Sequence, residues 1–487
     1  MTRRAWVRLD NASNVFLAAL SDADPKVFRM SAEMDRDVDP VLLQEALDAT
    51  YDRYRLYHAV LRRGIFWYYL QDSDLRPLVA PDTQHTCAPL YHADRAALLF
   101  RVAYHRRRIV LEVFHALSDG TGALWFLTDL ITEYVQRYPQ QQPPPGSSPE
   151  DDAPAPIEAA PAEPAPDDAT PHAHELTADS FVHYFHRRRR EDRRPPAESR
   201  SAFSGAAAPA AFSVEDAVRD VTVPTPVPGR EPRPPRRKIY RVTGTRTPDN
   251  RPRLVELTMP AKDVLALARA EGVALTSYLI AMFFESVRLS SSGLGRRRTL
   301  TASVPVNLRQ FFPSTSARNF FATFRAEHTY GEGADDFGSI CRGINDQFTA
   351  KVTPEALAKK LRRFIRLERM PVLRILPQPL KDLVLGLGNR ANNRGLSIAV
   401  SNLGLVQLPE PAETAVRRLL FHVSAVRPQF GAISHAGLLT ISFTSPFVET
   451  GHVREFARML TAQGIDVTVA AARVTEEELA EAEEEGS

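Results

Sequence analysis

The sequence predicts a mixed α/β (α+β) protein made of two domains. Segments with strand-like apolar patterns alternate with amphipathic helical segments on both sides of a long proline-rich region. The chain has 487 residues, a length that allows two or three domains with substantial cores. Its 44% of hydrophobic and 25% of charged residues are ordinary for a globular protein. We therefore expect mixed sheets flanked by helices in each half.

The proline-rich region determines the expected domain boundaries. About half of the 38 prolines fall between positions 139 and 235, among alanine, acidic and arginine runs. Such a composition buries too little apolar surface to offset the entropy lost on ordering. The expected divisions are an N-terminal domain over 1–138, a largely disordered linker over 139–250, a C-terminal domain over 251–475 and an acidic tail over 476–487.

Charge and cysteine content exclude several classes of protein. The chain has 61 Lys and Arg against 59 Asp and Glu, which is not the basic excess of a nucleic-acid-binding protein. Two cysteines cannot cross-link a fold of this size, so we expect a reducing compartment. The N-terminus lacks a signal peptide's apolar core, and no stretch has the length of a membrane span. We expect a soluble cytoplasmic protein.

In the first half the periodicity predicts a helix, a strand, a hairpin and a second helix. The hairpin turn is the basic sequence 105–108, and the last helix follows a Ser-Asp-Gly-Thr turn. The expected elements are a helix over Val41–Arg63, a strand over Ile65–Leu70, hairpin strands over Leu98–Tyr104 and Ile109–Phe114, and a helix over Gly122–Tyr138.

His115 lies at the end of the second hairpin strand. Ile109, Leu111 and Val113 share one face of that strand because side chains alternate with period two. The same alternation places His115 on this face, where the strand passes into the turn 118–121. Binding and catalytic residues often lie at such junctions between a strand and a loop.

The second half again mixes helices and strands, which supports a second α/β domain. The expected helices cover Lys262–Ala270, Thr276–Ser290, most of Asp335–Arg369 and Val453–Gln463, and the expected strands cover Leu300–Val306, Phe320–His328, Leu396–Ser401, Leu419–Val426 and Leu438–Phe443.

The hexapeptide His115-Ala-Leu-Ser-Asp119-Gly120 is the best candidate for chemistry. Of the 13 histidines only His115 has an aspartate four residues later that is followed directly by glycine. An imidazole with a pKa of about 6.5 can accept a proton from a hydroxyl or amine near neutral pH. Asp119 could hold the loop through an ion pair, and Gly120 would allow the backbone to turn. The alternative is a strand-end histidine beside a helix-capping aspartate.

Four pieces of the sequence carry a resemblance to one superfamily. Val113–Gly122 resembles the His-x-x-x-Asp-Gly motif of the chloramphenicol-acetyltransferase-like superfamily, which includes alcohol acetyltransferases, polyketide-associated acyltransferases and peptide condensation domains. Ser303–Arg309, followed by Arg318–Phe321, resembles the superfamily's arginine-ended strand and its Asn-containing successor. Val400–Gly404 is similar to the Ser-Asn-x-Gly strand end of the acyltransferase branch, and the opening Trp6–Ala12 resembles bacterial alcohol acetyltransferase-like proteins.

The resemblance implies two superfamily-type domains with an active-site tunnel at their interface. An acyl thioester would enter from one face and an acceptor alcohol from the other. His115 would match the general base, and Asp119 the structural aspartate that pairs with Arg309, since an unpaired carboxylate near a dry tunnel is costly. Ser401 and Asn402 would be candidates for donating a hydrogen bond to the oxyanion.

The predicted function is therefore acyl transfer from a CoA thioester, a co-substrate, to an alcohol. Condensation domains usually have two adjacent histidines, whereas Phe114 precedes His115 here. Two alternatives stay open: a condensation-type domain that takes acyl groups from a carrier protein to make esters or amides, and an inactive binding or scaffold protein. The histidines between 172 and 186 lack carboxylate or thiolate partners, so we expect no metal and no further cofactor.

Overall fold

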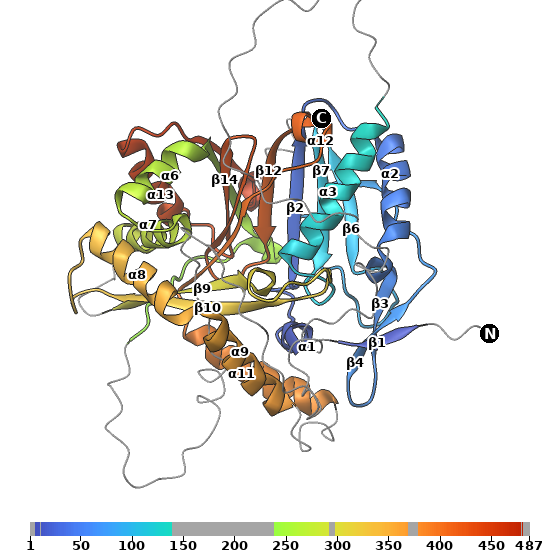
Figure 1. Cartoon of the computed structure of the whole chain (residues 1–487), viewed down its shortest axis with the longest axis horizontal. Coiled ribbons are helices and arrows are strands. Elements are labelled where there is room, and N and C mark those ends of the chain that lie inside the picture. The colour runs from blue at the N-terminus through green and yellow to red at the C-terminus, as the bar shows by residue number, and fades with distance from the viewer. Residues whose placement is uncertain are drawn as a thin grey trace, which may run out of the picture.

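The computed structural model describes residues 5–9, 11–138, 238–291, 298–368, 378–478 and 480. Figure 1 shows two halves side by side, each with a sheet covered by helices, which confirms the predicted mixed α/β class. The part of the predicted linker over 139–237 and the end of the predicted acidic tail lie outside the described residues.

The first half is built on a five-stranded sheet. Its strands are β2 (Val27–Met34), β5 (Ala80–Pro81), β6 (Phe100–His105), β7 (Arg108–Phe114) and β12 (Val416–Val423). Their order across the sheet is β12-β2-β7-β6-β5. The predicted hairpin is confirmed as β6 and β7, which pair antiparallel with Phe100 opposite Val113. β2 is the other antiparallel neighbour of β7, so the strand that leads to His115 is central in its sheet.

Two helices pack on this sheet. They are α2 (Pro40–Arg53) and α3 (Gly120–Gln136), and the predicted helix after the Ser-Asp-Gly-Thr turn is confirmed as α3. The helix expected over 41–63 is correct only as far as Arg53. Beyond it the chain forms the short 3-10 helix η1 (Arg55–His58) and then a strand, β3 (Ala59–Arg63).

A small three-stranded sheet lies beside this half, with order β1-β4-β3. Its other strands are β1 (Trp6–Arg8) and β4 (Tyr68–Asp72). The strand expected from Ile65 begins only at Tyr68, because the Gly64 amide donates to the Trp67 carbonyl at 2.9 Å and closes a turn. The helix α1 (Asn11–Ala18) follows β1 and contacts α11 (Gln378–Arg394) from the second half.

The second half contains a seven-stranded sheet. Its strands are β8 (Arg253–Pro260), β9 (Thr299–Asn307), β10 (Phe321–Thr329), β11 (Ile398–Leu405), β13 (Gln429–His435), β14 (Leu438–Ser445) and β15 (Thr468–Ala471). They are ordered β10-β9-β11-β13-β14-β8-β15. β11 runs parallel to both β9 and β13, and the other pairs are antiparallel.

Helices gather on one side of this sheet (Figure 1). They are α6 (Ala261–Ala270), α7 (Leu275–Ser290), α8 (Phe337–Lys351) and α13 (Gly451–Ala462), and α7 is buried along most of its length. α9 (Pro354–Glu368) and α11 extend away from the body, and the four-residue α12 (Ala412–Ala415) precedes β12. In the described residues no single helix could cross a membrane; α6 and α7 together have the required length and apolarity, but they meet at 86°.

The strand β12 joins the two halves. It belongs by sequence to the second half, yet it pairs antiparallel with β2 in the sheet of the first. Arg418 on β12 forms an ion pair with Glu33 on β2 at 2.7 Å, and Leu419 and Phe421 lie in the core of the first half. β12 therefore connects the second half of the chain to the sheet of the first half.

The last residues of the predicted linker pack on the second half. The Tyr240 amide donates to the Thr299 carbonyl at 2.8 Å, and Ile239 forms a parallel bridge to Thr299 on β9. The short 3-10 helix η2 (Pro248–Asn250) then leads into β8.

Candidate active site

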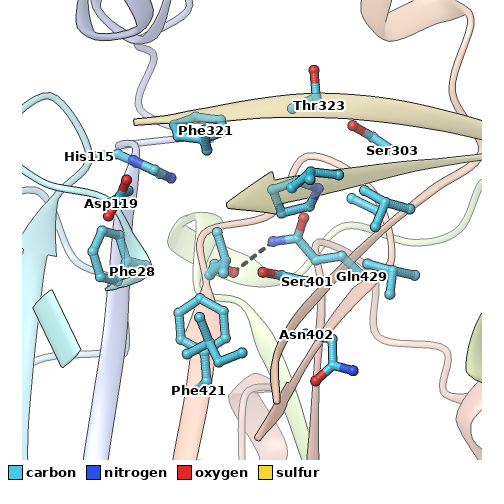
Figure 2. A pocket seen from close by; sticks show the side chains of 18 of the residues that line it. Phe28, His115, Asp119, Ser303, Phe321, Thr323, Ser401, Asn402, Phe421 and Gln429 are labelled. Atoms are coloured by element: carbon cyan, nitrogen blue, oxygen red, sulfur yellow. Dashed lines mark hydrogen bonds between the residues drawn. The ribbon is translucent and has the colours of Figure 1, made fainter. Parts of the chain in front are cut away.

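A cavity of about 330 Å³ lies where the two halves meet. Its first-half wall includes Phe28, His115 and Asp119, and its second-half wall includes Ser401 and Gln429. Figure 2 shows the His115 ring on the first-half side, pointing toward the space that Ser401 and Gln429 line from the other side. This is the arrangement expected for a site at a domain interface.

The backbone of His115 is held from both directions. Its amide donates to the Lys26 carbonyl at 2.7 Å, continuing the β2–β7 pairing by one residue. Its carbonyl accepts from the Asn319 side-chain amide at 2.8 Å, and that amide also donates to the Ser13 hydroxyl at 3.0 Å. Asn319 belongs to the second half, so the position of the imidazole depends on contacts from both halves.

The two ring nitrogens of His115 have different surroundings. Nδ1 is buried, and so is the Asn319 Oδ1, and neither has a hydrogen-bond partner within the described part of the chain. Nε2 is not buried and has no partner there either, so it faces the cavity. With the proton on the buried Nδ1, the lone pair of Nε2 is free to accept a proton from a molecule in the cavity.

Aromatic rings surround the imidazole. Phe16 stacks on it with ring centres 4.1 Å apart, Phe28 meets it edge-on at 5.1 Å, and Phe321 lies 5.6 Å away. This burial lowers the pKa of His115 to about 4, although Asp119 and Asn319 oppose the change. The ring is therefore neutral at physiological pH and able to act as a base.

Asp119 is buried and its two carboxylate oxygens are fully engaged. Oδ1 accepts from the Gly122 amide at 2.9 Å and caps α3. Oδ2 accepts from Arg309 Nη1 and from the Phe320 amide, both at 2.7 Å. The structure thus brings together the two residues whose pairing the resemblance implies. Neither oxygen bonds to the His115 ring, so Asp119 positions the loop and does not orient the imidazole as in a Ser-His-Asp triad.

Arg309 connects this loop to the second half. It follows β9, in the 3-10 helix η3 (Leu308–Gln310). Its Nη2 donates to the carbonyls of Ser316 and Arg318 at 2.8 and 2.7 Å. Its guanidinium also lies 5.2 Å from the centre of the Trp125 ring on α3. The Nη1 bond to Asp119 and the two Nη2 bonds to carbonyls together compensate the desolvation of a side chain that is only 7% exposed.

Gly120 and Gly122 follow Asp119, and they differ in how much space a side chain would have. Gly120 does not have positive φ, and a Cβ there would lie 3.0 Å from the Leu403 side chain. Glycine at 120 is therefore not needed for its backbone angles, but a Cβ there would crowd the Leu403 side chain. Gly122 is the sterically demanding position, because a Cβ would lie 2.2 Å from the Ala317 carbonyl oxygen. The loop that carries Ala317 also accepts the Ser118 hydroxyl at 2.6 Å, so the two halves meet closely here.

The two candidate oxyanion donors have different environments. The Asn402 amide donates to the Thr276 hydroxyl at 3.0 Å, and its Oδ1 accepts from the Gly404 amide at 2.9 Å, so Asn402 stabilises the end of β11. Ser401 lines the cavity, and its hydroxyl bonds to no residue that the structure describes. Gln429 donates to the Val423 and Ser424 carbonyls at 2.9 and 2.8 Å and is thereby fixed.

Several site residues were not expected from the sequence. They are the ring neighbours Phe16, Phe28 and Phe321, the backbone anchor Asn319, the steric position Gly122, and the charged cavity residues Asp24, Lys26 and Arg427. Among these, Gly122, Asn319 and Phe321 carried a local signal, since they lie within segments that resemble the superfamily. Over the described ranges, no three His, Cys, Asp or Glu side chains are grouped to hold a metal ion.

Comparison with known proteins supports the fold. No protein-family model matches the chain, and no curated protein matches it. Three solved structures are similar over nearly their whole length. TRI101 of Fusarium sporotrichioides, complexed with coenzyme A and T-2, has a TM-score of 0.53 at 10% identity, covering 96% of this chain and 99% of that one.

Two other solved structures are similar over a comparable part of the chain. TRI3 trichothecene 15-O-acetyltransferase, also from Fusarium sporotrichioides, has a TM-score of 0.53 at 9% identity, covering 95% and 94% of the two chains. The epimerization domain from the third module of tyrocidine synthetase B has a TM-score of 0.50 at 11% identity, covering 94% and 97%. The chain therefore shares the fold of these three structures, in agreement with the fold that the resemblance implies.

Proposed function

We propose that this chain transfers an acyl group from a CoA thioester to the hydroxyl of an alcohol, with His115 as general base. One observation carries the proposal: Nε2 of a neutral imidazole faces a cavity between the two halves, while Asp119 is turned to Arg309. That arrangement leaves the imidazole free for proton transfer, and the carboxylate keeps its loop in place.

The proposed reaction proceeds without a covalent acyl-enzyme. Nε2 of His115 takes the proton of the acceptor hydroxyl as the oxygen attacks the thioester carbonyl carbon. A tetrahedral intermediate forms, and the carbonyl oxygen carries its negative charge. The carbon–sulfur bond then breaks, the leaving thiolate takes the proton from the imidazolium, and the products are an ester and free CoA.

The developing oxyanion needs a hydrogen-bond donor. We assign this role to the Ser401 hydroxyl, because it lines the cavity and is not engaged with another described residue. A preorganised donor of this kind contributes about 2.7–4 kcal/mol. Asn402 is a weaker candidate because its amide already donates to Thr276.

Known structures with this fold support an acyl donor of the CoA type. One was solved with coenzyme A, and another is named as a 15-O-acetyltransferase. The rings of Phe16 and Phe28 pack against the His115 ring, and apolar surroundings of this kind limit the access of water to a thioester bound beside it. A carrier-protein thioester would undergo the same chemistry, and a comparison of the two donors distinguishes them.

A thiol-release assay tests the proposal. Purified protein is given acyl-CoA donors of increasing chain length with a panel of alcohols, and separately acyl-carrier-protein donors with the same alcohols. We expect alcohol-dependent release of CoA and formation of an ester. Release only from the carrier protein would instead favour the condensation-type alternative. Tight binding of donor or alcohol without turnover under any condition would favour the inactive binding protein.

A further inference from the structure

The charged side chains of the cavity are not all neutralised. Those that line it are Asp24, Lys26, Asp119 and Arg427. Asp119 pairs with Arg309, and Lys26 forms an ion pair with Asp24. Arg427 forms no ion pair with any carboxylate that the structure describes. Within the same part of the chain it donates one hydrogen bond, to the neutral side-chain amide oxygen of Asn393 at 2.6 Å.

The surroundings of Arg427 favour an additional negative charge. Burial lowers the pKa of Arg427 to about 10; Asp24 raises it, while Arg241 and Arg325 lower it. The carboxylate of Asp24 is shared, because it also accepts from the Ser424 hydroxyl at 2.9 Å. A partly buried guanidinium that lines the cavity and has no carboxylate partner among the described residues is suited to binding an anion.

This positive region and the proposed base belong to one cavity. Arg427 lies on the loop between β12 and β13, and it interacts electrostatically with Asp24, just before β2. The side chain of Lys26 pairs with Asp24, and its backbone carbonyl accepts a hydrogen bond from the His115 amide at 2.7 Å. An anion bound by Arg427 therefore occupies the same chamber as the reacting hydroxyl.

We propose that Arg427, supported by Asn393, binds a carboxylate or phosphate carried by the acyl acceptor, so that the acceptor is an anionic hydroxy compound and not a simple alcohol. This inference rests on the proposed function. The phosphates of CoA are the other source of such an anion, but the pantetheine arm separates them from the thioester. A group in the chamber of His115 is better explained by the acceptor.

The test compares a matched pair of acceptors, ω-hydroxyhexanoate and hexanol, with acetyl-CoA as donor. We expect the ratio of kcat/KM for the anionic over the neutral acceptor to fall about 10- to 100-fold in Arg427→Gln. For Arg427→Lys, which keeps the charge but lacks the planar guanidinium, we expect a ratio between those of the wild type and Arg427→Gln. Arg458→Gln, which removes an exposed arginine on α13, is the matched control and leaves the ratio unchanged.

Two further measurements separate the possible failures. If Arg427→Gln weakens the binding of acetyl-CoA but not that of the truncated donor acetyl-pantetheine, the anion belongs to the donor, and the proposal is overturned. Calorimetric binding of ω-hydroxyhexanoate needs no turnover, so it tests the anion site even if the chain is no acyltransferase. We expect binding about 10-fold or more weaker in Arg427→Gln. Equal affinity in the two proteins also overturns the proposal.

Discussion

Replacing Asp119 by alanine is expected to lower stability as well as activity. The substitution leaves the Arg309 guanidinium in a buried site without its carboxylate and leaves the Gly122 and Phe320 amides without acceptors. Removing one partner of a buried ion pair costs about 3–5 kcal/mol. At about 2–4 °C per kcal/mol for a domain of this size, we expect the Tm to fall by about 10 °C.

Thermal unfolding followed by circular dichroism measures this effect. Asp52→Ala is the control, because Asp52 pairs with Arg76 at the surface, where the two side chains are 58% and 56% exposed. Such pairs contribute about 0–1 kcal/mol, so the control Tm changes by a few degrees at most. The double variant Asp119→Ala/Arg309→Ala is expected to lose less stability than the sum of the single variants, because neither charge is left alone.

One outcome would contradict this structural role of Asp119. If Asp119→Ala lost activity but kept the wild-type Tm, Asp119 would act directly in the chemistry, and the bracing role would be wrong. Activity is measured well below the Tm of each variant, so that a change in kcat is not a change in the folded fraction.

Two further perturbations test the surroundings of His115 and the contact between the halves. Phe16→Ala removes the ring stacked on His115 at 4.1 Å and admits water, so the pKa of His115 is expected to rise from about 4 toward its ordinary 6.5. Because the neutral ring is the active form, the acid limb of the kcat/KM–pH profile moves to higher pH in this variant; an unchanged limb contradicts the assignment. Gly122→Ala places a Cβ 2.2 Å from the Ala317 carbonyl oxygen, and we expect a loss of about 1–3 kcal/mol in urea unfolding. Gly343→Ala on α8, where a Cβ meets nothing within 4 Å, is the control and is neutral or slightly stabilising; equal effects in the two variants would refute the steric explanation.

Local patterns were enough to predict the elements around the proposed base. The alternation of Ile109, Leu111 and Val113 defined β7, and the Ser-Asp-Gly-Thr turn located the start of α3. Both rest on interactions between residues close in sequence. That is why His115 was expected at a strand end and is found there.

Pairings between distant segments could not be predicted in the same way. No strand was expected over Val27–Met34, because the buried Arg29 and the partly buried Glu33 make this segment less apolar than a typical core strand. The pairing of β12 with β2 joins residues almost 400 positions apart, and nothing local to either strand specifies it. The anion site at Arg427 was missed for the same reason, since Asp24 and Asn393 come from remote parts of the chain.

The polar contacts of the site also join residues that are distant in sequence, and so local patterns do not predict them. The pairing of Asp119 with Arg309 was available only through the resemblance, because periodicity says nothing about a partner 190 positions away. Asn319 lies in a segment that resembles the superfamily, but its contact with the His115 carbonyl is seen only in three dimensions. The aromatic surroundings of His115, which set its pKa, depend on packing alone.

The most direct test of the proposed mechanism is the rate of acyl transfer by His115→Ala, with donor and acceptor binding measured separately by calorimetry. A general base contributes about 10²–10⁴-fold. We therefore expect kcat to fall by at least about 100-fold while both dissociation constants stay close to those of the wild type. Acyl transfer at the wild-type rate in His115→Ala would contradict the account.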